Sequence, residues 1–305
     1  MKSIAIQYYE AMNRIQQNTT LLRDVYMIIT PDKISGSLNG IALFAKTEEF
    51  KAINVGVALD VGIPTPTSEI QIVNQDKTQC IIQLDCYGEP IQSAFLPDVK
   101  TTAADPCGRF FVGFTQFREE QYRLSLESED SSEYTAANLI GVKGVTPYRI
   151  VPSHFRYFYV AYLAHNTSIA DFNRTVRGWV PEGENVKISV YYEATRSATT
   201  KADNTNPYWV AIEEAFKELN ITVRPSTIPT TTDAKFIVEA SIPTFGISPQ
   251  RFTVPLIGGV NERLSITVFN EGIRIYQKII PHLANLPKDK IAEDPGTYLI
   301  QPTII

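Results

Sequence analysis

The 305-residue sequence has few of the residues from which metal centres and nucleophilic sites are built. It contains three histidines and three cysteines. The histidines His154, His165 and His282 are isolated along the chain, and no CxxC, HxH or HExxH arrangement occurs. GxSxG and phosphate-binding glycine loops are also missing. We therefore predict no metal, no cofactor and no catalytic residues, and expect that the chain is not an enzyme.

The cysteines do not form an evident disulfide framework, because their number is odd. Cys80 and Cys86 lie in one alternating segment, which as an extended strand would separate them by roughly 20 Å. We predict both to be buried free thiols, and expect Cys107, in the sequence DPCG, to lie in an accessible loop.

Long apolar runs and blocks of like charge are absent as well. The longest apolar candidate, near 155–164, is interrupted by Arg156, so no membrane span is predicted. The first residues lack the pattern of a secretory signal. With a net charge of -5 and no basic arm, we expect no direct binding of nucleic acid.

Short segments with strand periodicity are the most frequent feature of the sequence. Residues 263–279 resemble a hairpin that turns at Asn270–Gly272. The chain is therefore predicted to be mainly antiparallel β, with strands near 23–30, 39–46, 50–60, 67–74, 78–87, 109–117, 121–128, 146–152, 154–164, 172–180, 186–194, 220–225, 235–242, 249–257, 262–270, 272–280 and 297–304.

Two of these segments, 110–117 and 155–163, are apolar on both faces when read as strands. A strand of this kind is expected to be covered twice, by a second sheet and by another subunit. The alternative is an aromatic core strand beneath a long loop. The first interpretation predicts a subunit interface made of Phe111, Phe114, Phe117, Phe155, Tyr157, Phe158 and Tyr159.

Helices are predicted at 207–219, where Asn206 is a suitable N-cap and Pro207 suits the first turn, and at 4–17. A short third helix is predicted at 132–139. The helix at 4–17 carries an apolar stripe that could lie on a membrane, dock on a neighbouring subunit or pack on its own domain. Its stripe consists of Ile4, Tyr8, Met12 and Ile15, with Ala11 between them.

The polar loop 165–171 is the preferred domain boundary, with Gly141–Pro147 as its competitor. It divides the chain into an N-terminal helical segment, 1–20, and two halves of similar strand number, 21–165 and 166–305. We predict that these halves are a duplicated antiparallel β-barrel, with one or two short packed helices.

In its two barrel-sized halves, its N-terminal helical segment and its helix at 207–219, the sequence resembles the double jelly-roll major capsid proteins of tailless, lipid-containing icosahedral bacteriophages. The resemblance implies that 21–165 and 166–305 are two antiparallel jelly-roll barrels in tandem. It implies a structural protein of the virion that is made in the host cytoplasm. It also implies homotrimers that contact neighbouring capsomers, penton or minor capsid proteins and an inner membrane. That family has no catalytic residues to transfer.

Two other functions fit parts of the sequence. A phage receptor-binding, tail or carbohydrate-binding β-sandwich would use Trp179, Tyr191 and Tyr208 as sugar platforms. A β-sandwich glycosidase would use Glu193 or Glu239 as its carboxylates.

Overall fold

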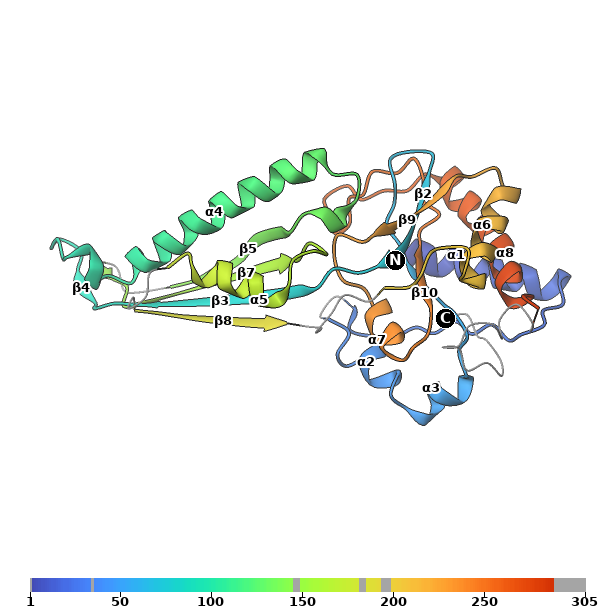
Figure 1. The fold of residues 1–305 in the computed structure, drawn as a ribbon, viewed down its shortest axis with the longest axis horizontal. Coiled ribbons are helices and arrows are strands. Elements are labelled where there is room, and N and C mark those ends of the chain that lie inside the picture. Colours follow the sequence, from blue (N-terminus) through green and yellow to red (C-terminus); the bar gives the residue numbers. More distant parts are fainter. Residues whose placement is uncertain (1, 34–35, 145–148, 181–184, 193–198, 288–305) are drawn as a thin grey trace. The chain divides into compact units, whose positions relative to one another are not determined.

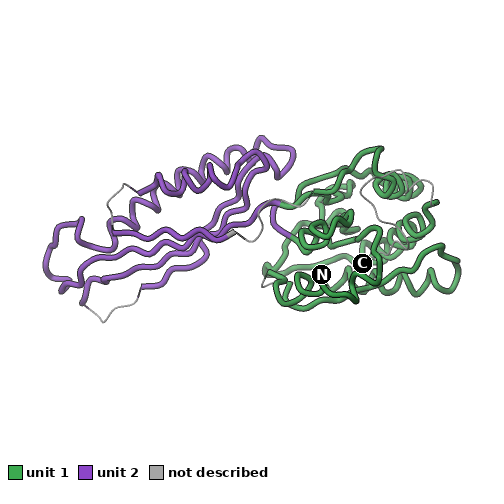
Figure 2. The backbone as a smooth tube through the Cα atoms, turned by 60° about the horizontal axis from the view of Figure 1, so that its bottom comes forward, with its two compact units in different colours: residues 1–76, 198–228, 232–305 green, residues 77–197, 229–231 purple. Residues whose placement is uncertain are grey.

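A computed structural model describes residues 2–33, 36–144, 149–180, 185–192 and 199–287. These residues form two compact units, shown in Figure 2. Unit 1 comprises 1–76, 198–228 and 232–305, and unit 2 comprises 77–197 and 229–231. Unit 2 is thus an insertion between segments of unit 1. The domain boundary predicted between residues 165 and 166 falls inside unit 2.

Unit 1 contains a four-stranded mixed sheet in the order β1-β10-β2-β9. Strands β1 (Ala58–Val61) and β10 (Thr244–Ile247) are parallel, as are β2 (Ile70–Gln75) and β9 (Val223–Thr227). The pair β10 and β2 is antiparallel. Parallel neighbours require long crossovers rather than hairpins, which excludes an up-and-down or jelly-roll order for these strands.

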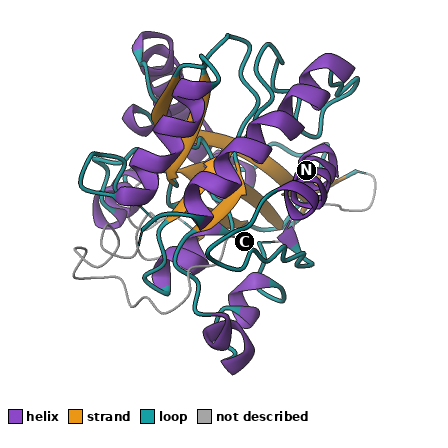
Figure 3. Cartoon of the chain, turned by 90° about the vertical axis from the view of Figure 1, so that its right-hand side faces the viewer, coloured by secondary structure: helices purple, strands orange, loops and turns teal. Residues whose placement is uncertain are grey.

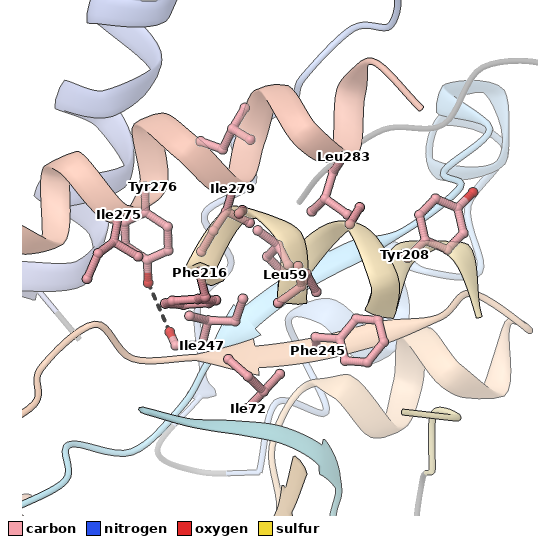
Figure 4. Close-up of a cluster of buried hydrophobic side chains, with 14 of the residues drawn as sticks. Leu59, Ile72, Tyr208, Phe216, Phe245, Ile247, Ile275, Tyr276, Ile279 and Leu283 are labelled. Atoms are coloured by element: carbon pink, nitrogen blue, oxygen red, sulfur yellow. Dashed lines mark hydrogen bonds between the residues drawn. The ribbon is translucent and has the colours of Figure 1, made fainter. Parts of the chain in front are cut away.

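Helices cover both faces of this sheet. Helices α1 (Lys2–Asn18), α6 (Pro207–Glu218) and α8 (Ile266–Ala284) bury their apolar stripes against one face, and Figure 4 shows side chains of this core. Helices α2 (Ile41–Phe44) and α7 (Ala234–Glu239) pack near Ala58 on the other face. Helix α3 (Glu48–Ile53) begins at Thr47, whose side chain accepts a hydrogen bond from the Phe50 amide.

The hairpin predicted over 263–279 is wrong, because this segment forms α8. Its buried residues Ile275, Tyr276, Ile279, Ile280 and Leu283 repeat with the spacing of a helix face. Tyr276 also donates a hydrogen bond from its hydroxyl to the Ile247 carbonyl of β10, at 2.9 Å, as drawn in Figure 4. Over a short window, the isoleucines of this segment also fit the two-residue period of a strand. Only their packing on the sheet shows that the helical period applies.

Unit 2 contains a four-stranded antiparallel sheet, whose order is β5-β7-β3-β8. Helices α4 and α5 lie on one of its faces, as Figure 1 shows for α4. A separate pair is formed by β4 and β6, with two short 3-10 turns, η2 and η3. The bounds are β3 Gln79–Tyr87, β4 Ile91–Gln92, η2 Val99–Thr101, α4 Ala104–Glu127, η3 Ser131–Glu133, β5 Ala136–Lys143, β6 Ile150–Val151, β7 His154–Tyr162, α5 Ile169–Arg177 and β8 Val186–Tyr192.

The strand predicted at 110–117 is wrong, because these residues form the middle of α4. Phe110, Phe114 and Phe117 are three or four residues apart, so one helix face carries them into the core beside Tyr159 and Trp179. The segment looks apolar on both faces only when it is read with a period of two.

The predicted fold class is therefore wrong: the chain has a mixed α/β fold rather than two jelly-roll barrels, with helices and strands in both units. Figure 3 distinguishes the helices from the strands by colour. Several further strand predictions fall on helices, at 39–46, 50–60, 121–128, 172–180 and 235–242, although 50–60 ends in β1. The helix predicted at 132–139 is η3 and the start of β5. No strand forms at 23–30 or 249–257, and 297–304 lies outside the described residues.

Other predicted elements are confirmed. The helices at 4–17 and 207–219 correspond to α1 and α6, and the Asn206 side chain accepts a hydrogen bond from the Tyr208 amide as the predicted cap. The strands near 67–74, 78–87, 154–164, 186–194 and 220–225 correspond to β2, β3, β7, β8 and β9. In the described part of the chain, no helix is long and apolar enough to cross a membrane.

The prediction of a buried free thiol is confirmed for Cys80 and wrong for Cys86. The accessible loop expected for Cys107 is also wrong, because this residue is buried in α4. Cys86 in β3 and Cys107 in α4 form a disulfide, with their Cα atoms 5.9 Å apart. A strand at Phe110 and its neighbours does not predict this pairing. Cys107 lies over β3 because it belongs to a helix that packs on the sheet.

We expect Cys107→Ala to lower the free energy of unfolding of unit 2 by about 3 kcal/mol, because the bridge closes a loop of 21 residues. Urea denaturation with and without a reducing agent measures this. Reduction should destabilise the wild-type protein by a similar amount and leave the variant unchanged. Equal stability of oxidised and reduced wild-type protein would contradict the expectation.

Candidate functional site

A cavity of about 200 Å³ lies in unit 1 beside β1. Its lining is apolar except at one end, where Lys33, Asp60 and Asp233 meet. In open α/β sheets, ligands bind next to the carboxyl ends of strands, and Asp60 is the third residue of the four-residue strand β1. The apolar lining comes from α1, the segment 25–30, β1, α2, α7 and α8, and includes Ile4, Tyr8, Met27, Ile41, Leu59, Ile237 and Ile280.

The Lys33 ammonium lies between two carboxylates. Its Nζ is 3.1 Å from Asp60 Oδ1 and 3.5 Å from Asp233 Oδ2. All three side chains are largely buried, with exposed fractions of 27% for Lys33, 11% for Asp60 and 14% for Asp233. Burial lowers the pKa of Lys33, but attraction to Asp60 and then Asp233 outweighs it, so the pKa is raised and the ammonium stays charged.

Hydrogen bonds to the chain hold both carboxylates in place. Asp60 Oδ1 accepts from the Val61 amide at 2.7 Å, and Asp60 Oδ2 accepts from the Ala234 amide at 3.2 Å. Asp233 Oδ1 accepts from the Ser37 hydroxyl. Each carboxylate therefore combines the Lys33 ammonium with a second donor, which fixes the geometry of this end of the cavity.

A stacked tyrosine pair joins α1 to α8 beside the cavity. The rings of Tyr8 and Tyr276 are stacked with centroids 3.9 Å apart. Tyr8 lines the cavity, and burial raises the pKa of both tyrosine hydroxyls. Both tyrosines therefore stay neutral and contribute to the packing between α1 and α8.

Asp76, at the end of unit 1's first segment, anchors the loop that carries Asp233. Its carboxylate accepts hydrogen bonds from the Thr232 amide at 2.6 Å and from the Thr232 hydroxyl at 2.9 Å. Burial raises the pKa of Asp76 to about 6, although both hydrogen bonds from Thr232 lower it. This side chain thus titrates nearer to neutral pH than an ordinary carboxyl.

We expect this raised pKa to appear as a pH-dependent stability. Between about pH 4 and pH 6, Asp76 is protonated in the folded state and ionised in the unfolded state. Its contribution to the free energy of unfolding therefore falls as pH rises through that window. The full effect is about 3 kcal/mol. Urea denaturation at several pH values should show a shallower decline for Asp76→Asn, whereas Asp24→Asn, at an exposed site, should follow the wild type. Parallel curves for all three proteins would contradict the raised pKa.

The three histidines remain apart. His154 Nε2 lies 2.7 Å from Asp85 Oδ1 in unit 2, and Arg156 Nε donates to the same oxygen at 2.6 Å. His282 Nε2 lies 3.1 Å from Glu218 Oε1 in unit 1. His165 lies beyond β7. Among the residues that the structure describes, no group of three or more His, Cys, Asp or Glu side chains could hold a metal ion.

The residues predicted to form a subunit interface divide between core and surface. Phe114 and Tyr159 are buried in the core of unit 2, and Phe117, Phe155 and Tyr157 pack against it. Phe111 is 44% exposed. The Phe158 ring has the Lys143 ammonium 5.5 Å from its centroid. A role in contacts between subunits stays a prediction, and Phe111 is the most accessible of this set.

The residues of the predicted docking helix lie mainly inside unit 1. Ile4 and Ile15 are buried, and Tyr8 and Met12 are partly buried against the same core, between α1 and α8. Of the alternatives for this helix, packing on its own domain agrees with these positions. Docking on a membrane or a subunit stays a prediction.

The aromatic and acidic residues named for the other two functions do not converge. Tyr208 is buried, Trp179 packs on the phenylalanines of α4, and Tyr191 is exposed. Glu239 is exposed at the end of α7, and Glu193 lies outside the described residues. No shared sugar site or carboxylate pair is formed by the described members.

The sequence reasoning did not identify Lys33, Asp60 or Asp233. One signal was available, since Asp60 interrupts the apolar strand sequence VALDV where a buried strand ends. The partners could not be inferred, because Asp233 is separated from Asp60 by the whole of unit 2.

Comparisons with known proteins agree with the mixed fold. Residues 1–282 match the family described as "Peptidase family M20/M25/M40". Rat "Aminoacylase-1A" is 32% identical over 292 residues, which cover 94% of this chain and 71% of the relative. Human "Aminoacylase-1" is 28% identical over the same shares of the two chains.

Two solved structures show the same fold. The aminopeptidase PepT from Bacillus cereus ATCC 10987 has a TM-score of 0.66 at 17% identity, over 93% of this chain and 71% of that chain. The M20 family metallo-carboxypeptidase Sso-CP2 from Sulfolobus solfataricus has a TM-score of 0.64 at 14% identity, over 93% and 76%.

These findings overturn the expectations drawn from the capsid resemblance. The resemblance is wrong, and with it the homotrimer, the capsid partners, the inner membrane and the place in a virion. The alternatives of a β-sandwich binding module or glycosidase are wrong for the same reason. The expectation that the chain is not an enzyme is also wrong, because the matching family and relatives are hydrolases.

Proposed function

Because the chain belongs to peptidase family M20/M25/M40, we propose that it is an aminoacylase-1-like hydrolase of this family that acts on N-acyl amino acids. The observation that carries the proposal is the 32% identity to rat Aminoacylase-1A along 94% of the chain. The similarity spans both units rather than a single motif, and this supports a shared ligand class.

The cavity beside β1 is the part of unit 1 that suits such a ligand. Its apolar lining would receive the hydrocarbon part of an N-acyl amino acid and exclude water from it. Tyr8 contributes its ring to this lining. These groups bind and orient a ligand, and no bond-breaking step is assigned to them.

A metal ion is implied by the name of one solved structure, the metallo-carboxypeptidase, so we asked whether side chains of this chain could bind one. The side chains present do not fit a metal ion. No cluster of three metal-binding side chains occurs in the described ranges, and the carboxylates of Asp60 and Asp233 are already paired with an ammonium. The binding role proposed for the cavity therefore rests on the chain's own side chains.

The proposal is tested by incubating the purified full chain with N-acetyl-L-leucine and N-acetyl-L-alanine and following the free α-amine. Calorimetric titration of the same compounds measures binding separately from turnover. We expect binding of N-acetyl-L-leucine and release of leucine. A chain that cleaves neither compound would overturn the proposal, even if it binds one of them.

Filling the cavity should weaken that binding. Ala5 lines the cavity on α1, so Ala5→Phe places a ring in the space that the acyl or side-chain group would occupy. We expect the affinity for N-acetyl-L-leucine to fall at least about tenfold, which corresponds to about 1.4 kcal/mol. Calorimetric titration checks this, and Ala52→Phe, on the exposed side of α3, is the matched control. Equal weakening by both variants would place the ligand elsewhere.

A further inference from the structure

The strongest unexplained feature of unit 1 is a buried lysine that lies between two aspartates at the end of an apolar cavity. We infer that Lys33 is the resident cation of this site, and that its ammonium group closes the Asp60–Asp233 carboxylate pair to divalent metal ions. Ligands of the cavity would then be bound without a metal.

The geometry places the ammonium where a cation is held between the carboxylates. Asp60 and Asp233 come from β1 and from the residue before α7, and their oxygens converge on one Nζ atom at 3.1 and 3.5 Å. Carboxylate oxygens bind Ca²⁺ or Mg²⁺ at roughly 2.0 to 2.6 Å. A metal ion that bridged the same two oxygens would overlap the space now filled by Nζ, so Lys33 would have to leave first.

The other groups around Lys33 do not favour the replacement of its ammonium by a metal ion. Asp60 Oδ2 and Asp233 Oδ1, the oxygens not bonded to Lys33, accept from the Ala234 amide and the Ser37 hydroxyl. Apart from Lys33 and the two aspartates, the cavity lining is mostly aliphatic and aromatic. Two carboxylates that are already hydrogen-bonded fall short of the six or more oxygen ligands that such ions usually take, even when waters fill some positions.

Charge leads to the same conclusion. Two carboxylates and one ammonium carry a net charge of -1, whereas the pair without Lys33 would carry -2 in a largely buried position. The lysine thus supplies the neutralisation that a metal would otherwise provide, and breaking it from its partners would leave buried charge unpaired. Replacing Lys33 with an acidic residue should remove the ammonium that excludes metal ions and make the site attract divalent ions.

Titration of the full chain with Mn²⁺ and with Zn²⁺, followed by calorimetry, tests the inference without using activity. The variants are Lys33→Glu, Lys33→Glu combined with Asp60→Asn, and Asp60→Asn alone. Lys51→Glu, at an exposed position on α3, is the matched control for the change of charge. Circular dichroism establishes folding, and Lys33→Asp replaces Lys33→Glu if that variant is unfolded.

We expect that Asp60→Asn alone does not change metal binding by the wild-type chain. Lys33→Glu should bind one ion per chain at least tenfold more tightly than wild type, and adding Asp60→Asn should abolish the gain. Lys51→Glu should show no gain. The inference is overturned if the wild-type chain binds an ion that Asp60→Asn weakens, or if the folded Lys33 variant gains no binding. Because deacylation is not the readout, failure here is distinct from failure of the proposed function.

Discussion

Replacing Asp60 with alanine should lower the free energy of unfolding of unit 1 by about 4 kcal/mol. The change removes one of the two carboxylates that neutralise Lys33, and it takes the Asp60 acceptor from the Val61 amide. The Ala234 amide also loses Asp60 but keeps the Thr232 hydroxyl oxygen at 3.1 Å. A buried backbone donor without a partner costs about 1 to 3 kcal/mol, which adds to the loss of the ion pair. Urea denaturation followed by circular dichroism measures the difference.

Two variants separate these contributions. Asp60→Asn keeps an oxygen acceptor while it removes the charge, so its cost should be clearly smaller than that of Asp60→Ala. Asp24→Ala removes a carboxylate at an exposed position of the same unit and should change stability by less than about 0.5 kcal/mol. If Asp60→Ala proves as mild as Asp24→Ala, then Asp60 does not hold this end of the cavity.

Replacing Phe114 with alanine should lower the free energy of unfolding of unit 2 by about 4 kcal/mol. Phe114 is 3% exposed on α4, and its ring centroid lies 4.5 Å from that of Tyr159 and 6.0 Å from that of Trp179. Truncation removes the transfer free energy of the ring and leaves a cavity between the helix and the sheet. Chemical denaturation monitored by tryptophan fluorescence suits the measurement, because Trp179 lies beside the ring.

The matched control is Phe111→Ala on the same helix. Phe111 is 44% exposed, so its truncation should cost less than about 1 kcal/mol. The pair therefore tests which side of α4 packs on the sheet, since Phe114 is buried and Phe111 is exposed on the same helix. Similar losses for both variants would contradict the packing of α4 on the sheet.

The cluster of Lys33, Asp60 and Asp233 and the similarity to aminoacylase-1 are independent observations. The similarity spans both units, while the cluster places one ammonium between two carboxylates at the end of β1. Ligand recognition, metal binding and turnover can therefore be measured as separate properties of this chain.

The sequence by itself determined the elements whose signals are local. Helix α6 has an Asn cap, a Pro in its first turn and an apolar stripe, and strands such as β3 and β8 alternate clearly, so 207–219, 78–87 and 186–194 could be assigned without a partner. It also showed that the histidines are isolated, because a count of three allows few clusters.

Tertiary structure decided everything that depends on which face is buried and which distant segments meet. Residues 110–117 and 263–279 satisfy both the strand and the helix period over short windows, and only packing against a sheet favours the helix. The same holds for the disulfide between Cys86 and Cys107 and for the meeting of Asp60 with Asp233. These pairs are joined by crossovers and by the insertion of unit 2, and short-range patterns carry no information about such long-range neighbours.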